Sequence, residues 1–290
     1  MPMDPVFFMS QTFQKISILG GGLLGGSIAL ALQDSREIRL WFRRPELLET
    51  ARLAGFRGAT ADLTEAVADC DLLILAVPVG AMPALLSAAV EAGLPSACLV
   101  TDVGSVKQTP HQQLAGILSK SGNPFIGSHP MAGSEKNGLL AAKADLFRNA
   151  ACLLTNDSNA PVQLANDLEK FWLDLGCRTR WFSAAQHDRI VARISHLPHV
   201  TAAATALSAL ESFAQYGELS GGGLKDTTRV ASGNTDMWAE ILTENREAVI
   251  EGVRDNIARL HEILASLEAG DLEATRQWLV AAKHLRDDLK

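Results

Sequence analysis

The sequence predicts an N-terminal α/β domain, built on a doubly wound and mostly parallel sheet, followed by an all-α C-terminal domain. From residue 15 to about 182, short β-rich runs alternate with helical patterns, which is typical of βαβ units. A glycine-rich turn joins the first run to the first helix. After Ser183 the strand pattern stops, and the chain becomes rich in Ala and Leu with helical spacing. The 290 residues are enough for two domains, with these expected boundaries: tail 1–14, α/β domain 15–183 and helical domain 184–290.

The expected strands of the sheet follow one another at regular intervals along the first domain. Before them, residues 1–14 carry two prolines and no periodicity, so we expect no regular structure there. The seven runs are 16–19, 38–42, 72–77, 97–101, 125–127, 151–154 and 178–182.

Composition and charge exclude several classes of protein. The chain has 26 Lys+Arg and 33 Asp+Glu, a net charge of −7, so it has no overall positive field for nucleic acid or an anionic membrane. The longest near-continuous apolar run, 72–79, is about a third of the length that a bilayer span needs. The first basic residue is Lys15, so the positive head of a secretory signal is missing. We expect a soluble, cytoplasmic protein.

The four cysteines predict neither disulfides nor a zinc site. Cys70, Cys98, Cys152 and Cys177 lie far apart and form no CxxC pair. We expect reduced thiols packed in a core and no metal centre.

The glycine-rich turn carries the pattern GxGxxG directly after the first strand and opens a helix. In this position the pattern is the fingerprint of a Rossmann dinucleotide-binding domain. Gly20 permits a tight turn, Gly22 lets the backbone approach a pyrophosphate, and Gly25 lets the helix pack closely on the strand. With Leu23 and Leu24 these residues are the expected cofactor contacts, since the helix N-terminus offers unpaired N–H groups to phosphate.

The end of the second strand indicates which dinucleotide binds. NAD enzymes usually have Asp or Glu there, which accepts hydrogen bonds from the ribose 2′-OH. Here the sequence has Arg43 and Arg44, and a guanidinium would instead bind a 2′-phosphate. We therefore predict NADP in preference to NAD. Val77, the last residue of the third run, and Pro78, which follows it, complete the expected cofactor site.

Two polar segments follow strands and fall at the sheet edge where open α/β sheets bind ligands. The segment DVGSVK (102–107) follows the fourth strand, and SHPMAGSE (128–135) follows the fifth. They bring His129, Ser105 and Glu135 to one edge. Imidazole titrates near neutral pH, so it can accept a proton in one step and release it in the next. We predict a catalytic rather than a structural role for His129.

The helical half contains two further groups suited to a ligand. In SHLPH, His196 and His199 lie on one face of a helix that Pro198 is expected to kink. The glycine run in GGGLKDTTR is expected to form a flexible loop that leads to Arg229, whose guanidinium suits an anion bidentately.

The longest expected helix has an apolar stripe with heptad-like spacing. Its residues recur at intervals of 4, 3, 4 and 3: Val253, Ile257, Leu260, Leu264 and Leu267. Such a stripe needs a partner surface along its length. Packing inside the helical domain and the interface of a homodimer remain open as its purpose.

Six motifs in this order resemble the prephenate/arogenate dehydrogenase family of tyrosine biosynthesis: GGGLLGGS, DVGSVK, SHPMAGSE, SHLPH, GGGLKDTTR and Met237-Trp238. The resemblance runs through nearly the whole chain. It implies a Rossmann domain, a helical domain that dimerises, and an active site in the cleft between them. It also implies oxidative decarboxylation of a cyclohexadienol, prephenate or arogenate, to a phenol with hydride transfer to NAD(P)+.

The resemblance also implies roles for individual residues. His129 corresponds to the catalytic base, and Ser105 forms a hydrogen bond to the same substrate hydroxyl and orients it. Arg229 corresponds to the carboxylate anchor, held by Glu135 and Asp226 in an ionic network. The other residues expected to line the cleft are His196, His199, Ser134, Gly222 and Trp238.

The sequence departs from the commonest family pattern at Phe42-Arg43-Arg44, where many members have Asp, and this puts NAD in doubt. Whether prephenate or arogenate is the substrate remains open.

Two other functions are weaker matches to the residues. The β-hydroxyacid dehydrogenase group, which includes imine and 6-phosphogluconate reductases, shares the architecture but relies on a lysine in the helical domain. Lys225 is the only candidate near a glycine loop, and the motif SHPMAG would have no role. A non-catalytic dinucleotide sensor would not need His129, Ser105 and Arg229 together.

Overall fold

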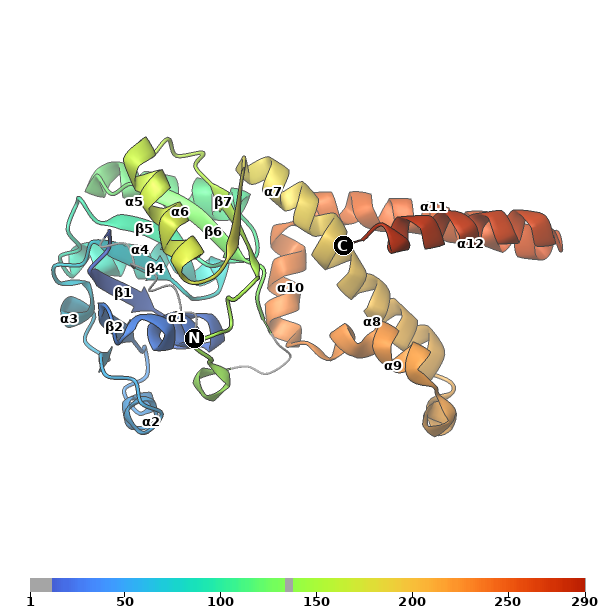
Figure 1. Ribbon diagram of the computed structural model, residues 1–290, viewed down its shortest axis with the longest axis horizontal. Coiled ribbons are helices and arrows are strands. Elements are labelled where there is room, and N and C mark those ends of the chain that lie inside the picture. The colour runs from blue at the N-terminus through green and yellow to red at the C-terminus, as the bar shows by residue number, and fades with distance from the viewer. Residues whose placement is uncertain (1–11, 134–137, 290) are drawn as a thin grey trace, which may run out of the picture.

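The computed structural model describes residues 12–133 and 138–289 and consists of a sheet domain followed by helices that project away from it (Figure 1). The sheet has eight strands in the order β3-β2-β1-β4-β5-β6-β7-β8. All neighbouring strands are parallel except β6 and β7. The predicted doubly wound, mostly parallel sheet is confirmed. The strands are β1 (Lys15–Leu19), β2 (Glu37–Trp41), β3 (Ala59–Thr60), β4 (Leu72–Leu75), β5 (Leu99–Asp102), β6 (Phe125–Pro130), β7 (Ala151–Thr155) and β8 (Arg178–Phe182).

All seven predicted strands are present, with differences at their ends. β4 stops at Leu75, two residues before the predicted end, because the chain leaves the sheet there to form a loop. β6 continues to Pro130, three residues beyond the predicted end, because it pairs with the antiparallel strand β7. β3 was not predicted, since two residues are too few to show a strand pattern.

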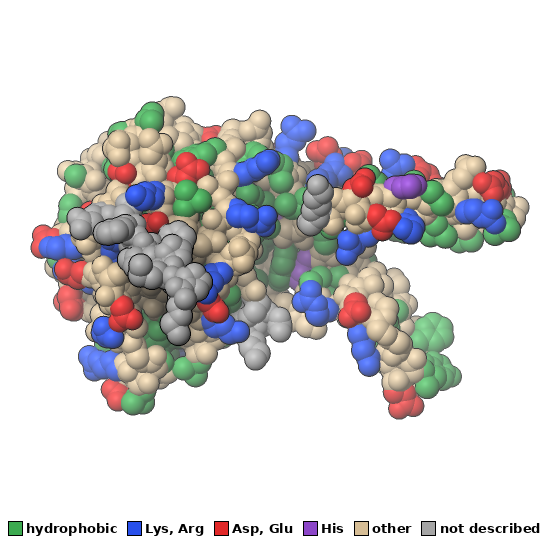
Figure 2. Space-filling view, in the orientation of Figure 1, with side chains coloured by type: hydrophobic (Ala, Val, Ile, Leu, Met, Phe, Trp, Pro, Cys, Tyr) green, Lys and Arg blue, Asp and Glu red, His purple; other side chains and the backbone are tan. Residues whose placement is uncertain are grey.

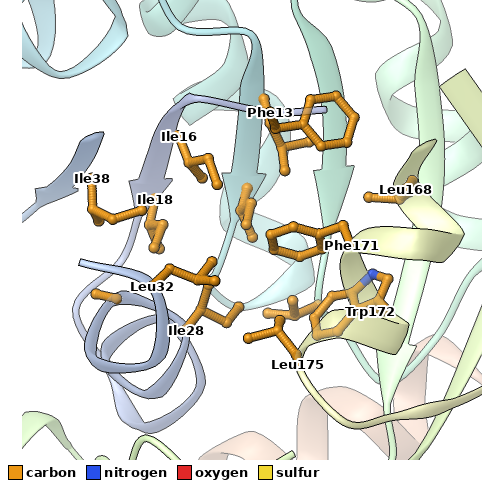
Figure 3. Packing of buried hydrophobic residues seen from close by; sticks show 14 of the residues in the cluster. Phe13, Ile16, Ile18, Ile28, Leu32, Ile38, Leu168, Phe171, Trp172 and Leu175 are labelled. Carbon is orange, nitrogen blue, oxygen red and sulfur yellow. The ribbon is translucent and has the colours of Figure 1, made fainter. Parts of the chain in front are cut away.

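Helices cover both faces of the sheet. On one face, α1 (Leu23–Leu32) and α6 (Val162–Asp174) bury apolar side chains against the strands; Figure 3 shows Ile28 and Leu32 of α1 and Trp172 of α6 in this core. On the other face lie α3 (Leu63–Val67), α4 (Met82–Glu91) and α5 (Gln108–Ser121). A short helix, α2 (Leu47–Leu53), follows β2.

The apolar run at 72–75 forms the centre of the sheet. All four residues of β4 are fully buried, because the strand is covered on both faces. In the part of the chain that the structure describes, no helix combines the length and apolarity needed to cross a membrane.

Phe13 belongs to the core although it lies in the segment expected to be a tail. Its ring is buried and packs edge-on against Phe171, with 6.3 Å between centroids. The packed part of the sheet domain therefore includes residues before β1.

The predicted packing of the cysteines is confirmed. All four are buried and free, and the Sγ atoms of Cys70 and Cys98 lie 3.4 Å apart.

The helical domain begins at a well-defined cap. The Ser183 hydroxyl accepts a hydrogen bond from the Gln186 backbone N–H, and the Gln186 side chain accepts one from the Ser183 N–H. The helices that follow are α7 (Ala184–Val191), the π-helical segment η3 (Ala192–His196), α8 (Leu197–Leu210), the 3₁₀ segment η4 (Ala214–Leu219), α9 (Gly222–Thr228), the 3₁₀ segment η5 (Arg229–Ser232), α10 (Thr235–Glu244), α11 (Arg246–Glu268) and α12 (Leu272–Asp287).

Pro198 does not interrupt α8. It occupies the first turn, where the missing N–H costs no helical hydrogen bond. The irregularity lies just before it, in the π-helical segment that ends at His196.

The apolar stripe of α11 is not covered by its own chain. Ile257, Leu260, Leu264 and Leu267 are between 47% and 61% exposed, although α12 packs beside the same helix. Figure 2 shows hydrophobic side chains along the edge of the arm that α11 and α12 form. Internal packing therefore does not account for the stripe.

Candidate functional site

The glycine turn after β1 has the close packing that its sequence pattern predicts. Gly20 has φ +124°, and a Cβ there would overlap the carbonyl oxygen of Ala76. A Cβ on Gly25 would overlap the carbonyl oxygen of Gly20, so both positions require glycine. At Gly22, by contrast, a Cβ would meet no described atom within 4 Å. The turn thus leaves open space at the N-terminus of α1.

That open space belongs to a cleft of about 560 Å³ between the sheet domain and the helical domain. Its walls come from the loops after β1, β4, β5 and β6 on one side, and from η3 and α10 on the other. The expected site residues that line it are Gly22, Leu23, Leu24, Val77, Pro78, Ser105, His129, His196 and Trp238. Residues that the sequence did not single out also line it, among them Ser195, Asn234, Glu240 and Glu244.

His129 lies near the end of β6 and is buried. Its Nδ1 atom is 2.8 Å from Nε2 of His187 on α7. Burial lowers the pKa of His129 well below its ordinary value, and positive charge on His187, Lys107 or His196 would lower it further. The imidazole is therefore neutral at neutral pH and able to accept a proton.

Asp188 completes a buried chain with the two histidines. Its Oδ1 atom is 2.8 Å from His187 Nδ1, and its two carboxylate oxygens also accept hydrogen bonds from the backbone N–H groups of Lys107 (2.7 Å) and Gln108 (3.0 Å). Burial alone would raise the pKa of Asp188, but these hydrogen bonds outweigh it and lower the pKa. An ionised carboxylate from α7 thereby caps the start of α5.

A buried ion pair shapes the loop that carries Ser105. The Lys107 Nζ atom binds the Asp102 carboxylate, and both side chains are fully buried. Asp102 Oδ2 also accepts a hydrogen bond from the Gly104 N–H at 2.8 Å. Gly127 gives the lysine stem room, since a Cβ there would lie 2.7 Å from Lys107 Cδ.

His196 is held by a different partner. Asn245, between α10 and α11, donates through Nδ2 to the Asp188 carbonyl oxygen at 2.8 Å and lies 3.2 Å from His196 Nδ1. Burial lowers the pKa of His196 to about 4, against the opposing attraction of Asp188. This imidazole is also neutral at neutral pH.

His199 lies behind the cleft rather than in it. Its ring stacks on the Trp238 indole with 3.6 Å between centroids and an angle of 14° between planes. Trp238 lines the cleft, so His199 supports that wall from outside.

Several expected site residues are not brought to this cleft by their own chain. Gly222, Asp226 and Arg229 are exposed on α9 and η5, and they are not among the residues that line the cleft. The ion pairs of the described residues include neither Arg229 nor Asp226. Ser134 and Glu135 lie outside the described residues, so their expected contacts stay predictions.

Arg43 and Arg44 come one residue after the end of β2 and are exposed. Neither belongs to the ion pairs of the described residues, so both guanidinium groups are available to an anion.

Sequence reasoning missed the buried groups that surround the cleft: Asp102, Lys107, His187, Asp188 and Asn245. Lysine and aspartate are ordinarily exposed, so nothing in the sequence marks the pair in DVGSVK as buried. The adjacent His187-Asp188 on the helix after the last strand is the one signal that could have been used.

The comparisons with known proteins agree with this geometry. Residues 28–180 match the family model described as the nucleotide-binding domain of prephenate dehydrogenase, and residues 183–281 match that of its dimerization domain. Prephenate dehydrogenase from Lactococcus lactis subsp. cremoris is 31% identical over 284 residues, covering 96% of this chain and 78% of that protein. Cyclohexadienyl dehydrogenase from Zymomonas mobilis is 32% identical over 267 residues, covering 89% and 90%.

A solved structure is similar over the whole fold. Prephenate dehydrogenase from A. aeolicus, in complex with hydroxyphenyl propionate and NAD+, superposes with a TM-score of 0.86 at 26% identity, covering 96% of this chain and 98% of that one. Its dinucleotide agrees with a nicotinamide cofactor for the glycine turn and the cleft. With two family models that together span most of its length, the chain belongs to the prephenate dehydrogenase family.

Proposed function

We propose that the protein catalyses the NAD(P)+-dependent oxidative decarboxylation of prephenate or arogenate, which yields 4-hydroxyphenylpyruvate or tyrosine. The observation that carries this proposal is the position of His129. It is a buried neutral imidazole in a cleft that it shares with the glycine turn. A general base beside a dinucleotide site is what oxidation of an alcohol requires.

The residues of the cleft fit a dinucleotide. The open space at Gly22 and the first turn of α1 would receive the pyrophosphate, and Val77 and Pro78 would contact the nicotinamide half. The bound cofactor would accept a hydride from the ring carbon that carries the hydroxyl.

The chain itself supplies proton transfer and orientation. His129 takes the hydroxyl proton as the carbon is oxidised, and Ser105, in the loop after the neighbouring strand β5, orients that hydroxyl. The bond between the ring and its carboxylate then breaks, CO₂ leaves, and the electron pair of that bond moves through the ring to the new carbonyl oxygen. This oxygen takes the proton back from His129, and the ring becomes an aromatic phenol. Loss of CO₂ makes the reaction irreversible.

A steady-state experiment tests the base. His129→Asn should lower kcat by roughly 10²–10⁴-fold with little change in KM. Assaying prephenate and arogenate, each with NAD+ and NADP+, identifies the substrate at the same time. A kcat near that of the wild type would exclude His129 as the base.

We propose that NADP is preferred over NAD, since Arg43 and Arg44 stand where a carboxylate would select NAD. Replacing both arginines with Ala should lower kcat/KM for NADP+ and leave that for NAD+ nearly unchanged. Arg57→Ala, an exposed arginine paired with Asp34, is the matched control. A wild-type preference for NAD+ would refute the proposal.

For the substrate carboxylate we propose Arg229 as the anchor. It is exposed and unpaired among the described ion pairs, and its segment leads into Asn234 at the cleft. Arg229→Ala should chiefly raise KM, because an anchor acts in the ground state and the transition state alike. Lys225→Ala, about one turn away, should retain activity, whereas the β-hydroxyacid dehydrogenase alternative expects that change to abolish it.

We propose a homodimer formed through the exposed stripe of α11. Leucine side chains at heptad spacing on a long helix suit a second copy of the same face. Leu260→Glu with Leu264→Glu should give monomers in light scattering, and Arg259→Glu on the polar side of the helix should not. Unchanged dimers of the double variant would refute this interface.

A further inference from the structure

Both imidazoles that line the cleft engage a buried partner through Nδ1. His129 uses Nδ1 on His187, and His196 uses Nδ1 on Asn245. In each ring, Nε2 is the nitrogen left for a molecule in the cleft. Among the described residues, some buried side-chain nitrogen and oxygen atoms have no hydrogen-bond partner, and neither Nε2 atom is one of them. The buried partners therefore decide whether Nε2 of each ring presents a lone pair or an N–H group to the cleft.

The character of His129 follows from Asp188. An ionised carboxylate can only accept, so His187 Nδ1 must carry the proton that is donated to Asp188. A neutral His187 then has a lone pair on Nε2, and this lone pair can only accept from His129 Nδ1. With its proton on Nδ1, His129 presents an unprotonated Nε2.

His196 has the opposite character. The Asn245 Nδ2 group donates to the Asp188 carbonyl oxygen, which identifies that end of the side chain as the amide nitrogen. The same nitrogen faces His196 Nδ1, so Nδ1 must accept. A neutral His196 then carries its proton on Nε2.

We propose that His187 and Asn245, both anchored on Asp188, are positioning residues that fix His129 and His196 in opposite tautomers. The proposal deepens the proposed function and rests on it for the chemistry. His129 offers a lone pair to the substrate hydroxyl, and His196 offers an N–H to a substrate oxygen. When His129 takes up the proton, its Nδ1–H remains bonded to His187, whose own N–H points to the carboxylate of Asp188.

Burial, more than the surrounding charges, holds this arrangement against protonation. Besides Asp188 on α7, the charged groups packed around the pair are Asp102 at the end of β5 and Lys107 in the loop that follows. The two carboxylates favour a proton on His187, and Lys107 opposes it. Positive charge on Lys107 disfavours a second proton on either ring of the His129–His187 pair.

NMR tests the tautomers directly and without turnover. In a long-range ¹H–¹⁵N correlation spectrum of the full-length protein with ¹⁵N-labelled histidine, His129 should show a proton on Nδ1 and His196 one on Nε2. His129→Asn and His196→Asn assign the signals by their disappearance. Reversed tautomers at His129 would overturn the proposal. Expected tautomers in a protein that turns over neither prephenate nor arogenate would instead leave it standing and refute the proposed function.

Steady-state kinetics tests whether His187, the partner of His129, affects the rate of the reaction. His187→Leu removes the acceptor and should lower kcat by about 10²-fold with KM nearly unchanged. His187→Gln places an amide oxygen near the position of Nε2 and should restore kcat to within roughly tenfold of the wild type. The control is His111→Gln, since His111 is also buried but bonds to Ser158 and Thr155 outside the cleft.

The outcomes separate positioning from packing. Equal losses in His187→Leu and His187→Gln, or a His187→Leu variant as active as His111→Gln, would overturn the role of His187. At the other ring, Asn245→Asp replaces the donor by an acceptor and should move the His196 proton to Nδ1. If that signal does not move in the NMR spectrum, Asn245 does not set the tautomer of His196.

Discussion

Lowering the pH from 7 to 5 should destabilise the protein through the buried imidazole of His196. Its pKa is about 4 in the folded protein, whereas an unfolded chain gives histidine a pKa of about 6.5. Between these values the unfolded chain binds more protons than the folded one, so stability falls as the pH falls. The contribution of neutral His196 to the unfolding free energy is complete above about pH 6.5. It is lost progressively as the pH falls toward 4.

The size of this effect follows from the shift. A difference of about 2.5 pKa units corresponds to roughly 3 kcal/mol in full, and about 2 kcal/mol of it is lost by pH 5. Other buried histidines, such as His129 and His187, also have lowered pKa values and act in the same direction. A variant is therefore needed to isolate His196.

His196→Asn removes the titrating ring but keeps an oxygen that can accept from Asn245. Urea unfolding is followed by tryptophan fluorescence at pH 7 and pH 5, at one protein concentration. The wild type should lose about 2 kcal/mol more unfolding free energy over this interval than the variant does. His284→Asn, an exposed site on α12, controls for the loss of an imidazole. Equal pH losses in the wild type and His196→Asn would refute the reasoning.

Three further predictions concern the sheet domain. Lys107→Met leaves the buried carboxylate of Asp102 without its cation and should lower the unfolding free energy by about 3–5 kcal/mol in urea titrations; a loss below 1 kcal/mol would contradict the buried pair. Gly25→Ala forces a methyl group into the carbonyl oxygen of Gly20, and thermal unfolding should reveal a loss of roughly 3 kcal/mol or more. The methyl group of Gly22→Ala would meet no described atom, so the unfolding free energy should change by less than about 1 kcal/mol. The cofactor KM should rise at least tenfold, and an unchanged KM would place the pyrophosphate elsewhere.

The fold was largely predictable because its signals are local. A strand covered on both faces is apolar throughout, as β4 is, and GxGxxG at a strand-to-helix turn is specific to dinucleotide-binding domains. The cap at Ser183 likewise fixes the start of the helical domain within one turn of chain. β3 was not predicted because two residues are too few to show a strand pattern.

The site was predictable only where a residue lies at a strand end. Parallel strands bring their carboxyl ends to one edge, so Ser105 and His129 could be placed together. The glycine run before Arg229 was expected to form a flexible loop, but it begins the short helix α9, because Gly221 caps a helix that continues to Thr228. No rule of local structure relates that helix to the sheet. In the structure it is exposed and does not line the cleft of its own chain, so its role as anchor stays a proposal.

By itself, the sequence determined the order along the chain of the strands other than β3, the glycine turn, the loop that carries Ser105 and the strand end that carries His129. Each of these depends on residues close together along the chain. Only the tertiary structure decided that Asp188, 59 positions after His129, reaches it through His187, and that Asn245 joins Asp188 to His196. Burial is the physical reason. Excluding water from these groups makes each hydrogen bond obligatory, and which groups are excluded depends on how distant segments pack.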